Sequence, residues 1–282
     1  MKKSTLTFLF CDSEYNEANT VIFGAPFDGT TSFRPGTRFA PQVMRQESYG
    51  LEVYSPYQDE NLTDKAIFDA GDLVPTIGNV GAMIDLIHDF TKKILEDKKL
   101  PIMIGGEHSL TVGTIRAVAE KYPDMYILHF DAHTDLRDVY YEHKLSHANV
   151  LYRAWEILGD NKIYQFGIRS GAKEEFEWAK THVIQNKYNT QGLDEALKTI
   201  GNKPVYITID LDILDPSVFP GTGTPEPGGI TFHELLNAIL KFRGLNVVGA
   251  DVMELSPHYD HTGASTAVAC KVLRELLIAI CK

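Results

Sequence analysis

The sequence predicts an α/β fold built around a mostly parallel β-sheet. Short apolar runs rich in β-branched residues alternate with segments of helical periodicity along all 282 residues. No linker or internal repeat interrupts the alternation, so we expect one domain that spans residues 1–282. Residues able to ligate metals follow several of the predicted strands, and ligands bind at those strand ends in parallel sheets.

The first half of the chain is predicted to hold three helices and four strands. The strands cover residues 21–24, 66–70, 102–104 and a central run that begins at 125 and leads into Asp131. The helices cover 41–50, 80–97 and 109–121. Pro41 is favoured in a first helical turn, Gly50 suits the stop, and Ser109 is expected to cap the third helix.

The second half continues the same alternation. Helices are predicted at 146–158, 174–179, 193–200, 231–242 and 263–281, and strands at 163–167, 182–184, 205–209 and 246–253. Thr231 and Glu234 form a capping-box pattern at the start of one helix. Residues 138–144 are expected to form a surface loop over the site. Residues 215–229 form a Pro- and Gly-rich loop too long to be idle in a compact fold.

Composition excludes some classes of partner. The net charge of −11 argues against nucleic acid, and no apolar segment is long enough for a membrane helix. Cys11, Cys270 and Cys281 fit neither a set of paired disulfides nor a metal motif, which indicates a reducing, cytoplasmic location. The first 11 residues are interpreted as mature sequence, because their apolar stretch is short and interrupted by polar residues.

Three potential metal ligands follow the central strand. Asp131, His133 and Asp135 occupy every second position, so in extended chain they share one face. The first and last would then lie ~13 Å apart. One ion with bonds of ~2.1 Å cannot span that distance. Either the chain curls sharply here or these residues serve more than one ion.

Further ligands follow two other predicted strands. Asp210 and Asp212 come after 205–209, and His108 follows 102–104. Together with the central group they make four aspartates, which would raise one another's pKa unless cations neutralise them. Two divalent ions would balance the four charges. The oxygen-rich set suits Mn(II), with Zn, Co, Ni and Fe as alternatives. A turn or cap role explains a single Asp-x-Asp pair, but not three strand ends at once.

A two-metal site predicts hydrolysis by a metal-activated hydroxide. His147 follows the polar loop after Asp135 and is a candidate proton shuttle, the alternative being an ordinary surface histidine. The other histidines are assigned no catalytic role; they are His88, His129, His143, His182, His233, His258 and His261.

Four motifs together resemble the ureohydrolase family, which contains the arginases and agmatinases. They are Gly-Gly-Glu-His-Ser (105–109), Phe-Asp-Ala-His-Thr-Asp (130–135), Asp-Leu-Asp-x-x-Asp-Pro-Ser (210–217) and Gly-Thr-Gly-Thr-Pro-Glu-Pro-Gly-Gly (221–229). The resemblance covers nearly the whole chain. It implies a three-layer α/β/α fold, two Mn(II) ions per chain and a homo-oligomer, either a trimer or a hexamer.

The resemblance also implies roles for individual residues. His147 corresponds to the proton shuttle, Glu254 to the glutamate that holds the guanidinium group, and Asp135 to the acceptor of a hydrogen bond from the bridging hydroxide. The implied metal ligands are His108, Asp131, His133, Asp135, Asp210 and Asp212.

The substrate tail separates the branches of the family. Positions 136, 137, 148 and 149 do not match the residues with which arginases hold an α-amino acid, and the loop 31–41 resembles the agmatinase branch. The predicted reaction is therefore agmatine plus water to putrescine plus urea. Arg137, if it points inward, would instead favour guanidinobutyrate. Asp138 and Glu226 are candidates for contact with the substrate's ammonium group.

Two other classes are weaker alternatives. They are an inactive regulatory relative and a deacetylase of related fold with one catalytic metal. Intact His147 and Glu254 argue against the first, and six intact ligand positions argue against the second.

Overall fold

An eight-stranded sheet forms the centre of the protein. The computed structural model describes residues 1 and 4–282, and the strand order is β4-β1-β5-β10-β9-β6-β7-β8 with every neighbouring pair parallel. The strands are β1 (Thr20–Ala25), β4 (Ile67–Asp72), β5 (Leu100–Gly105), β6 (Tyr126–Phe130), β7 (Ile163–Ile168), β8 (Ile184–Lys187), β9 (Val205–Asp210) and β10 (Val247–Met253). The predicted parallel α/β architecture is confirmed.

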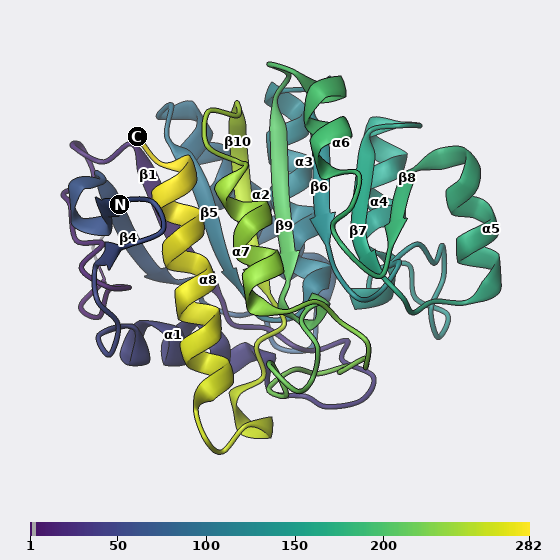
Figure 1. Cartoon of the computed structure of the whole chain (residues 1–282), viewed down its shortest axis with the longest axis horizontal. Helices are drawn as coiled ribbons and strands as arrows, with labels where there is room; N and C mark the ends of the chain where they lie inside the picture. Colours follow the sequence, from purple (N-terminus) through teal and green to yellow (C-terminus); the bar gives the residue numbers. More distant parts are fainter. Residues whose placement is uncertain (2–3) are drawn as a thin grey trace.

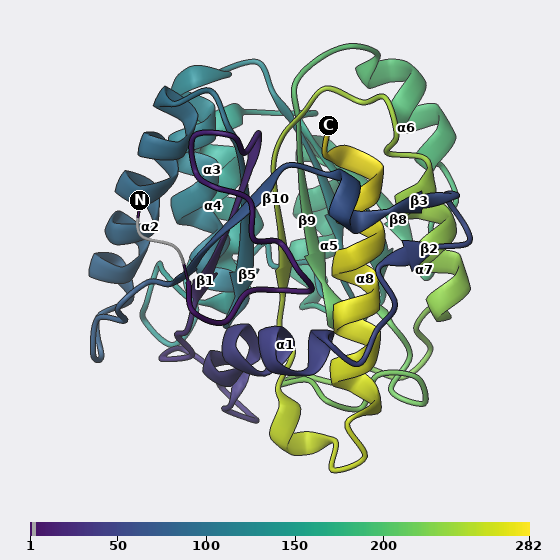
Figure 2. The same cartoon turned by 90° about the vertical axis from the view of Figure 1, so that its left-hand side faces the viewer.

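Helices cover both faces of this sheet, which gives the three layers visible in Figures 1 and 2. One face carries α1 (Ala40–Ser48), α6 (Leu193–Ile200), α7 (Phe232–Leu240) and α8 (Ala264–Ile280). The other face carries α2 (Val80–Glu96), α3 (Thr111–Lys121) and α4 (Val150–Leu158), with α3 packed between its two neighbours. The last helix, α5 (Lys173–His182), packs beside β8 at the sheet edge.

The two-sided cover explains the sequence pattern of the strands. All six residues of β9 are buried, as are five of the six in β5. Strands buried on both faces require continuous apolar runs rather than alternation. Helix starts follow local rules too. The Thr231 hydroxyl accepts a hydrogen bond from Glu234 N, and the Glu234 carboxylate accepts one from Thr231 N, so the predicted capping box is confirmed.

Two local expectations differ from the structure, and one small element was not predicted. The predicted strand at 182–184 is wrong, because α5 continues to His182 and β8 begins at Ile184. Ser109 does not cap α3; its hydroxyl donates to the Glu107 carboxylate, within a 3₁₀ turn at His108–Leu110. A two-residue hairpin pair, β2 (Tyr54–Ser55) and β3 (Glu60–Asn61), was not predicted because its strands are too short for a readable period.

No helix within residues 1 and 4–282 combines the length and apolar character needed to cross a bilayer.

Candidate metal centre and active site

Four adjacent strands deliver the site. In the order β5-β10-β9-β6, their carboxyl ends lie at one edge of the sheet. His108, Glu254 and Asp131 follow β5, β10 and β6, and Asp210 is the last residue of β9. A cavity of about 300 Å³ opens there. The predicted residues that line it are His108, His133, Asp135, His147, Asp210 and Glu254. Asp131 and Asp212, almost completely buried, lie beneath this surface.

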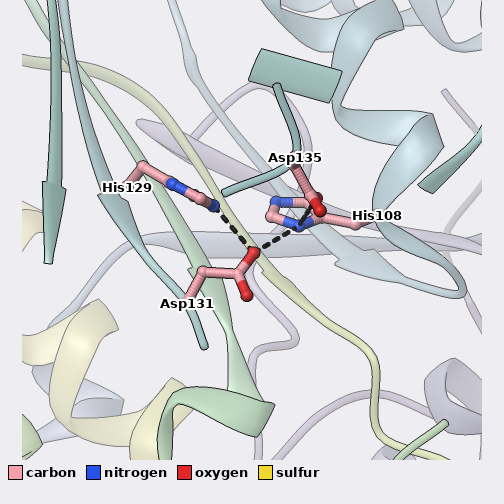
Figure 3. Close-up of side chains that lie close together, drawn as sticks. All are labelled: His108, His129, Asp131 and Asp135. Carbon is pink, nitrogen blue, oxygen red and sulfur yellow. Dashed lines mark hydrogen bonds and ion pairs between the residues drawn. The ribbon is translucent and has the colours of Figure 1, made fainter. Parts of the chain in front are cut away.

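The first ligand group surrounds one nitrogen of His108 (Figure 3). His108 Nδ1 lies 3.2 Å from Asp131 Oδ2, 3.2 Å from Asp135 Oδ2 and 3.4 Å from Asp210 Oδ2. Among the residues that the structure describes, this buried nitrogen nevertheless has no partner with hydrogen-bond geometry. Two ligands at right angles around an ion with ~2.1 Å bonds are ~3 Å apart. The donors are therefore spaced as metal ligands, and Thr208 Oγ1, 2.8 Å from Nε2, orients the ring.

A second ligand group surrounds His133. Its Nδ1 lies 3.0 Å from Asp212 Oδ2 and 3.4 Å from Asp131 Oδ1. Asp131 thus presents one carboxylate oxygen to each group. The sequence left two possibilities open, a sharp curl of the chain or ligands divided between ions. The structure has both features: the chain curls after β6, and the residues divide into two groups of donors.

Backbone strain accompanies the curl. Asp135 has φ 52° and Glu254 has φ 66°, in the left-handed region that non-glycine residues seldom occupy. Such a conformation costs ~1–3 kcal/mol and persists only where its surroundings impose it. The left-handed backbone conformation at Asp135 turns its carboxylate back towards His108, whereas an extended chain would carry it away.

Electrostatics also indicate a cationic ligand. Burial, together with the charge of Asp131, raises the pKa of the Asp135 carboxyl to about 7. Burial and the neighbouring Asp212 and Asp131 likewise raise the pKa of Asp210. These carboxylates can stay ionised together at neutral pH only beside positive charge. Bound cations would supply that charge.

His129 belongs to the cluster although the sequence interpretation gave it no role. Its Nε2 lies 2.8 Å from Asp131 Oδ2, and its Nδ1 lies 3.0 Å from Gln165 Nε2. The Gln165 amide nitrogen can only donate, so His129 Nδ1 accepts and Nε2 carries the proton that is given to Asp131. His129 therefore orients the carboxylate that both donor groups share. The every-second-residue spacing, extended back from Asp131, was the signal for it.

Glu254 and His147 complete the polar lining of the cavity. Glu254 Oε1 accepts a hydrogen bond from His108 N at 2.7 Å. Burial raises the pKa of this carboxyl, so a cationic substrate would favour its charged form. Burial, followed by the charge of His133, lowers the pKa of His147 to about 4. His147 Nε2 lies 3.2 Å from Ser32 Oγ, on the loop 31–41 that resembles the agmatinase branch; the sequence did not predict this contact.

The outer part of the cavity contains Arg137. Its Nε lies 3.2 Å from Glu175 Oε2, and its guanidinium lies 4.7 Å from the ring centroid of Tyr140. Asp138, expected near the substrate, is instead paired with Arg153 at 2.5 Å. The Arg169 side chain donates to the backbone oxygens of Asp212 and Glu226 and so holds the loop between them.

Comparison with known proteins identifies the family. The arginase family model matches residues 18–279. The chain belongs to the arginase family.

Relatives within the arginase family differ in substrate. An agmatinase from Bacillus subtilis is 45% identical over 279 residues, which cover 98% of this chain and 96% of the relative. The crystal structure of agmatine ureohydrolase from Thermoplasma volcanium superposes with a TM-score of 0.89 at 35% identity, covering 98% of this chain and 94% of that one. Proclavaminate amidinohydrolase from Streptomyces clavuligerus is 34% identical, covering 92% of this chain and 87% of the relative.

Proposed function

We propose that this arginase-family enzyme is an agmatinase, which hydrolyses agmatine to putrescine and urea. The observation that carries the proposal is the geometry of the site. Two groups of buried carboxylate and imidazole donors share Asp131, and the carboxylate of Glu254 lies beside them. The 45% identity to the Bacillus subtilis agmatinase over almost the whole chain supports the choice of branch.

The donor set fits two Mn(II) ions per chain. His108, Asp135 and Asp210 would hold one ion and His133 and Asp212 the other, with the Asp131 carboxylate shared. Carboxylates with some imidazole are the ligands that Mn(II) prefers. Metal ions held there would supply an activated water close to neutral pH.

The remaining steps fall to side chains of this chain. The Glu254 carboxylate would hold the planar guanidinium through charge-assisted hydrogen bonds. His147 would give a proton to the departing amine nitrogen, which must leave as a neutral amine. Asp135, beside both His108 and the cavity, would orient the attacking oxygen through a hydrogen bond.

The substrate tail is assigned from the outer cavity. An arginine carboxylate would need donors that positions 136, 148 and 149 do not provide in the arginase manner, and an unpaired buried charge is strongly disfavoured. Arg137 lines the cavity, which favours guanidinobutyrate as the second candidate. Its charge is balanced by Glu175, however, and agmatine remains the preferred substrate.

A panel of substrates tests the proposal. Urea release would be measured with Mn(II) from agmatine, arginine, guanidinobutyrate and guanidinopropionate. We expect kcat/KM for agmatine to exceed that for arginine by more than ~10²-fold, since the two differ only by the carboxylate. Equal efficiency on both would refute the assignment, and a higher value for guanidinobutyrate would replace it with the second candidate.

We further propose that residues 1–282 form one ureohydrolase domain, that the protein assembles as a trimer or hexamer, and that it acts in the cytoplasm on small cationic guanidino compounds. Binding to nucleic acid or membrane is not expected. Light scattering of the purified protein would give the oligomeric state directly.

A further inference from the structure

A polar chain connects a fully buried carboxylate to the candidate proton shuttle. Glu107 precedes His108 and is completely buried. Thr30, in the loop after β1, contacts Glu107 twice, through its amide at 2.7 Å and its hydroxyl at 2.6 Å. The same hydroxyl lies 3.1 Å from His147 N and 3.5 Å from His147 Nδ1. Among the described residues, Thr30 is thus the one that forms hydrogen-bond contacts with both Glu107 and His147.

The direction of each hydrogen bond follows from counting protons. A threonine hydroxyl has one proton, and here it lies on the short contact with the Glu107 carboxylate. Towards His147, Thr30 Oγ1 can therefore only accept. It accepts from the His147 backbone amide, and the ring contact requires a proton on Nδ1. Nε2 is left as the acceptor, facing Ser32 Oγ at 3.2 Å.

We propose that Glu107 and Thr30 are positioning residues that hold His147 in the tautomer with its proton on Nδ1, so that Nε2 faces the cavity and exchanges the proton used in the reaction. The arrangement has the order of a carboxylate–histidine pair with one hydroxyl between them. The proposal rests on the proposed function, because it refines the proton-transfer step assigned to His147.

The surroundings fix Glu107 for this task. The Glu107 amide donates to Phe27 O at 2.9 Å, and Ser109 donates its hydroxyl to the carboxylate. Directly before it, a Cβ on Gly106 would lie 1.9 Å from Phe27 O, so only glycine allows the β5 end to approach the Thr30 loop this closely. The Thr30 amide, the Thr30 hydroxyl and the Ser109 hydroxyl all donate to the Glu107 carboxylate, so the Thr30 proton is directed towards Glu107 and away from His147.

The relay formed by Glu107, Thr30 and His147 serves the step in which the amine leaves the guanidino carbon. The bond between the guanidino carbon and the departing nitrogen breaks, and its electron pair stays on the nitrogen. His147 Nε2, which carries no proton at rest, first takes the proton that the attacking water loses and then gives it to that nitrogen. The hydroxyl left on the carbon loses its own proton to the released amine and becomes the carbonyl of urea. Throughout, Nδ1 keeps its proton, because the Thr30 hydroxyl accepts from Nδ1 while its own proton stays on the contact with Glu107.

Substitutions at Thr30 test the relay. Thr30→Val keeps the β-branched shape and removes the hydroxyl, so we expect kcat on agmatine to fall ~10–100-fold with little change in KM and unchanged metal content. Thr30→Ser restores a hydroxyl and is expected to recover kcat to within ~3-fold of wild type. Thr31→Val is the matched control, because Thr31 Oγ1 lies 3.5 Å from Glu107 and, within the described part of the chain, forms no hydrogen bond with His147. Its kcat should stay near wild type.

Each outcome decides whether Thr30 acts in the relay to His147 or only supports the loop in which it lies. Wild-type kcat in Thr30→Val, a loss shared equally by Thr31→Val, or a failure of Thr30→Ser to restore kcat would overturn the relay. A loss expressed mainly in KM or in bound metal would show that Thr30 only supports the loop, and would also overturn it. If Thr30→Val does not fold, Thr30→Ala is compared with Thr30→Ser in the same way. Absence of urea release by the wild type would instead refute the proposed function, so the two failures are distinguishable.

Discussion

The edge of the sheet at the carboxyl ends of the strands (the carboxyl edge) and the edge at their amino ends (the amino edge) both carry many charged residues, but these residues have different roles. The carboxyl edge holds a cavity of about 300 Å³ above buried aspartates. The amino edge holds a larger hollow of about 1100 Å³ with a basic lining. Its cationic residues are Lys65, Lys98, Lys99, Lys121, Arg243 and Lys282. Size alone would direct attention to the amino edge.

The charges of the amino edge are explained by the ends of the helices. Helices α2, α3, α7 and α8 all finish there, and cations near helix C-termini are favoured by the macrodipole. Lys121 Nζ donates to Leu95 O at 2.6 Å, and Lys65 and Arg243 each pair with Glu60 at 2.7 Å. These contacts stabilise the fold. At the carboxyl edge, by contrast, carboxylates of like charge are buried close to one another. Backbone strain and charge repulsion at the same place therefore indicate the active site better than cavity volume does.

The largest expected effect is the loss of the shared carboxylate. Asp131→Asn removes the negative charge and one ligand oxygen from the side chain that, among the described residues, faces both donor groups, so bound Mn(II) should fall from about two ions per chain to below one. Because each ion contributes several kcal/mol to the reaction, kcat/KM should fall at least ~10³-fold. Elemental analysis and urea release measure both quantities.

His133→Asn is the matched variant, because His133 contacts only the second group. About one ion per chain should remain. A wild type that reaches full activity with a single tightly bound ion would refute the two-metal interpretation.

Glu254→Gln should have the next largest effect. It removes the charge expected to face the guanidinium but keeps an oxygen for His108 N. Turnover on agmatine should therefore fall by ~2–4 kcal/mol, or about 30- to 900-fold, with metal content unchanged. Loss of metal would instead make Glu254 a ligand.

Residue patterns that extend over whole helices and strands were enough to predict the fold, but they could not predict contacts between individual residues. Residues 193–200 and the strand after 205 agree with α6 and β9 because propensity, periodicity and burial coincide there. His182 was misplaced because the end of α5 and the start of β8 follow each other within two residues, too closely for either period to show.

The candidate site divides in the same way. Residues that share a strand end, such as Asp210 and Asp212, could be grouped by counting along the chain. Thr30 and His147 are 117 positions apart, and their contact exists only after the sheet has formed. The orientation of Arg137 likewise depends on Glu175, which lies in the first turn of α5 and is distant from Arg137 in sequence.

Arg137→Gln should have a small effect at the carboxyl edge. Glu175 already balances the guanidinium, and Tyr140 holds it from one face, so kcat/KM for agmatine should change by less than ~5-fold. Steady-state kinetics on agmatine and guanidinobutyrate measure it. A large gain for agmatine would mean that Arg137 repels the substrate's ammonium group, and wild-type preference should then lie with guanidinobutyrate.

The smallest effect is expected at the amino edge, where Lys121→Met removes a charge from the last residue of α3 and the hydrogen bond to Leu95 O. Cations at this position contribute ~0.3–1 kcal/mol to stability. The unfolding temperature should therefore fall by about 1–3 °C, while kcat and metal content stay unchanged. Lys98→Met, in the same hollow and without an ion pair or side-chain hydrogen bond among the described residues, should lower the unfolding temperature less. A change in kcat for either variant would contradict the separation of roles, because it would couple the basic hollow to the metal centre across the full length of the sheet.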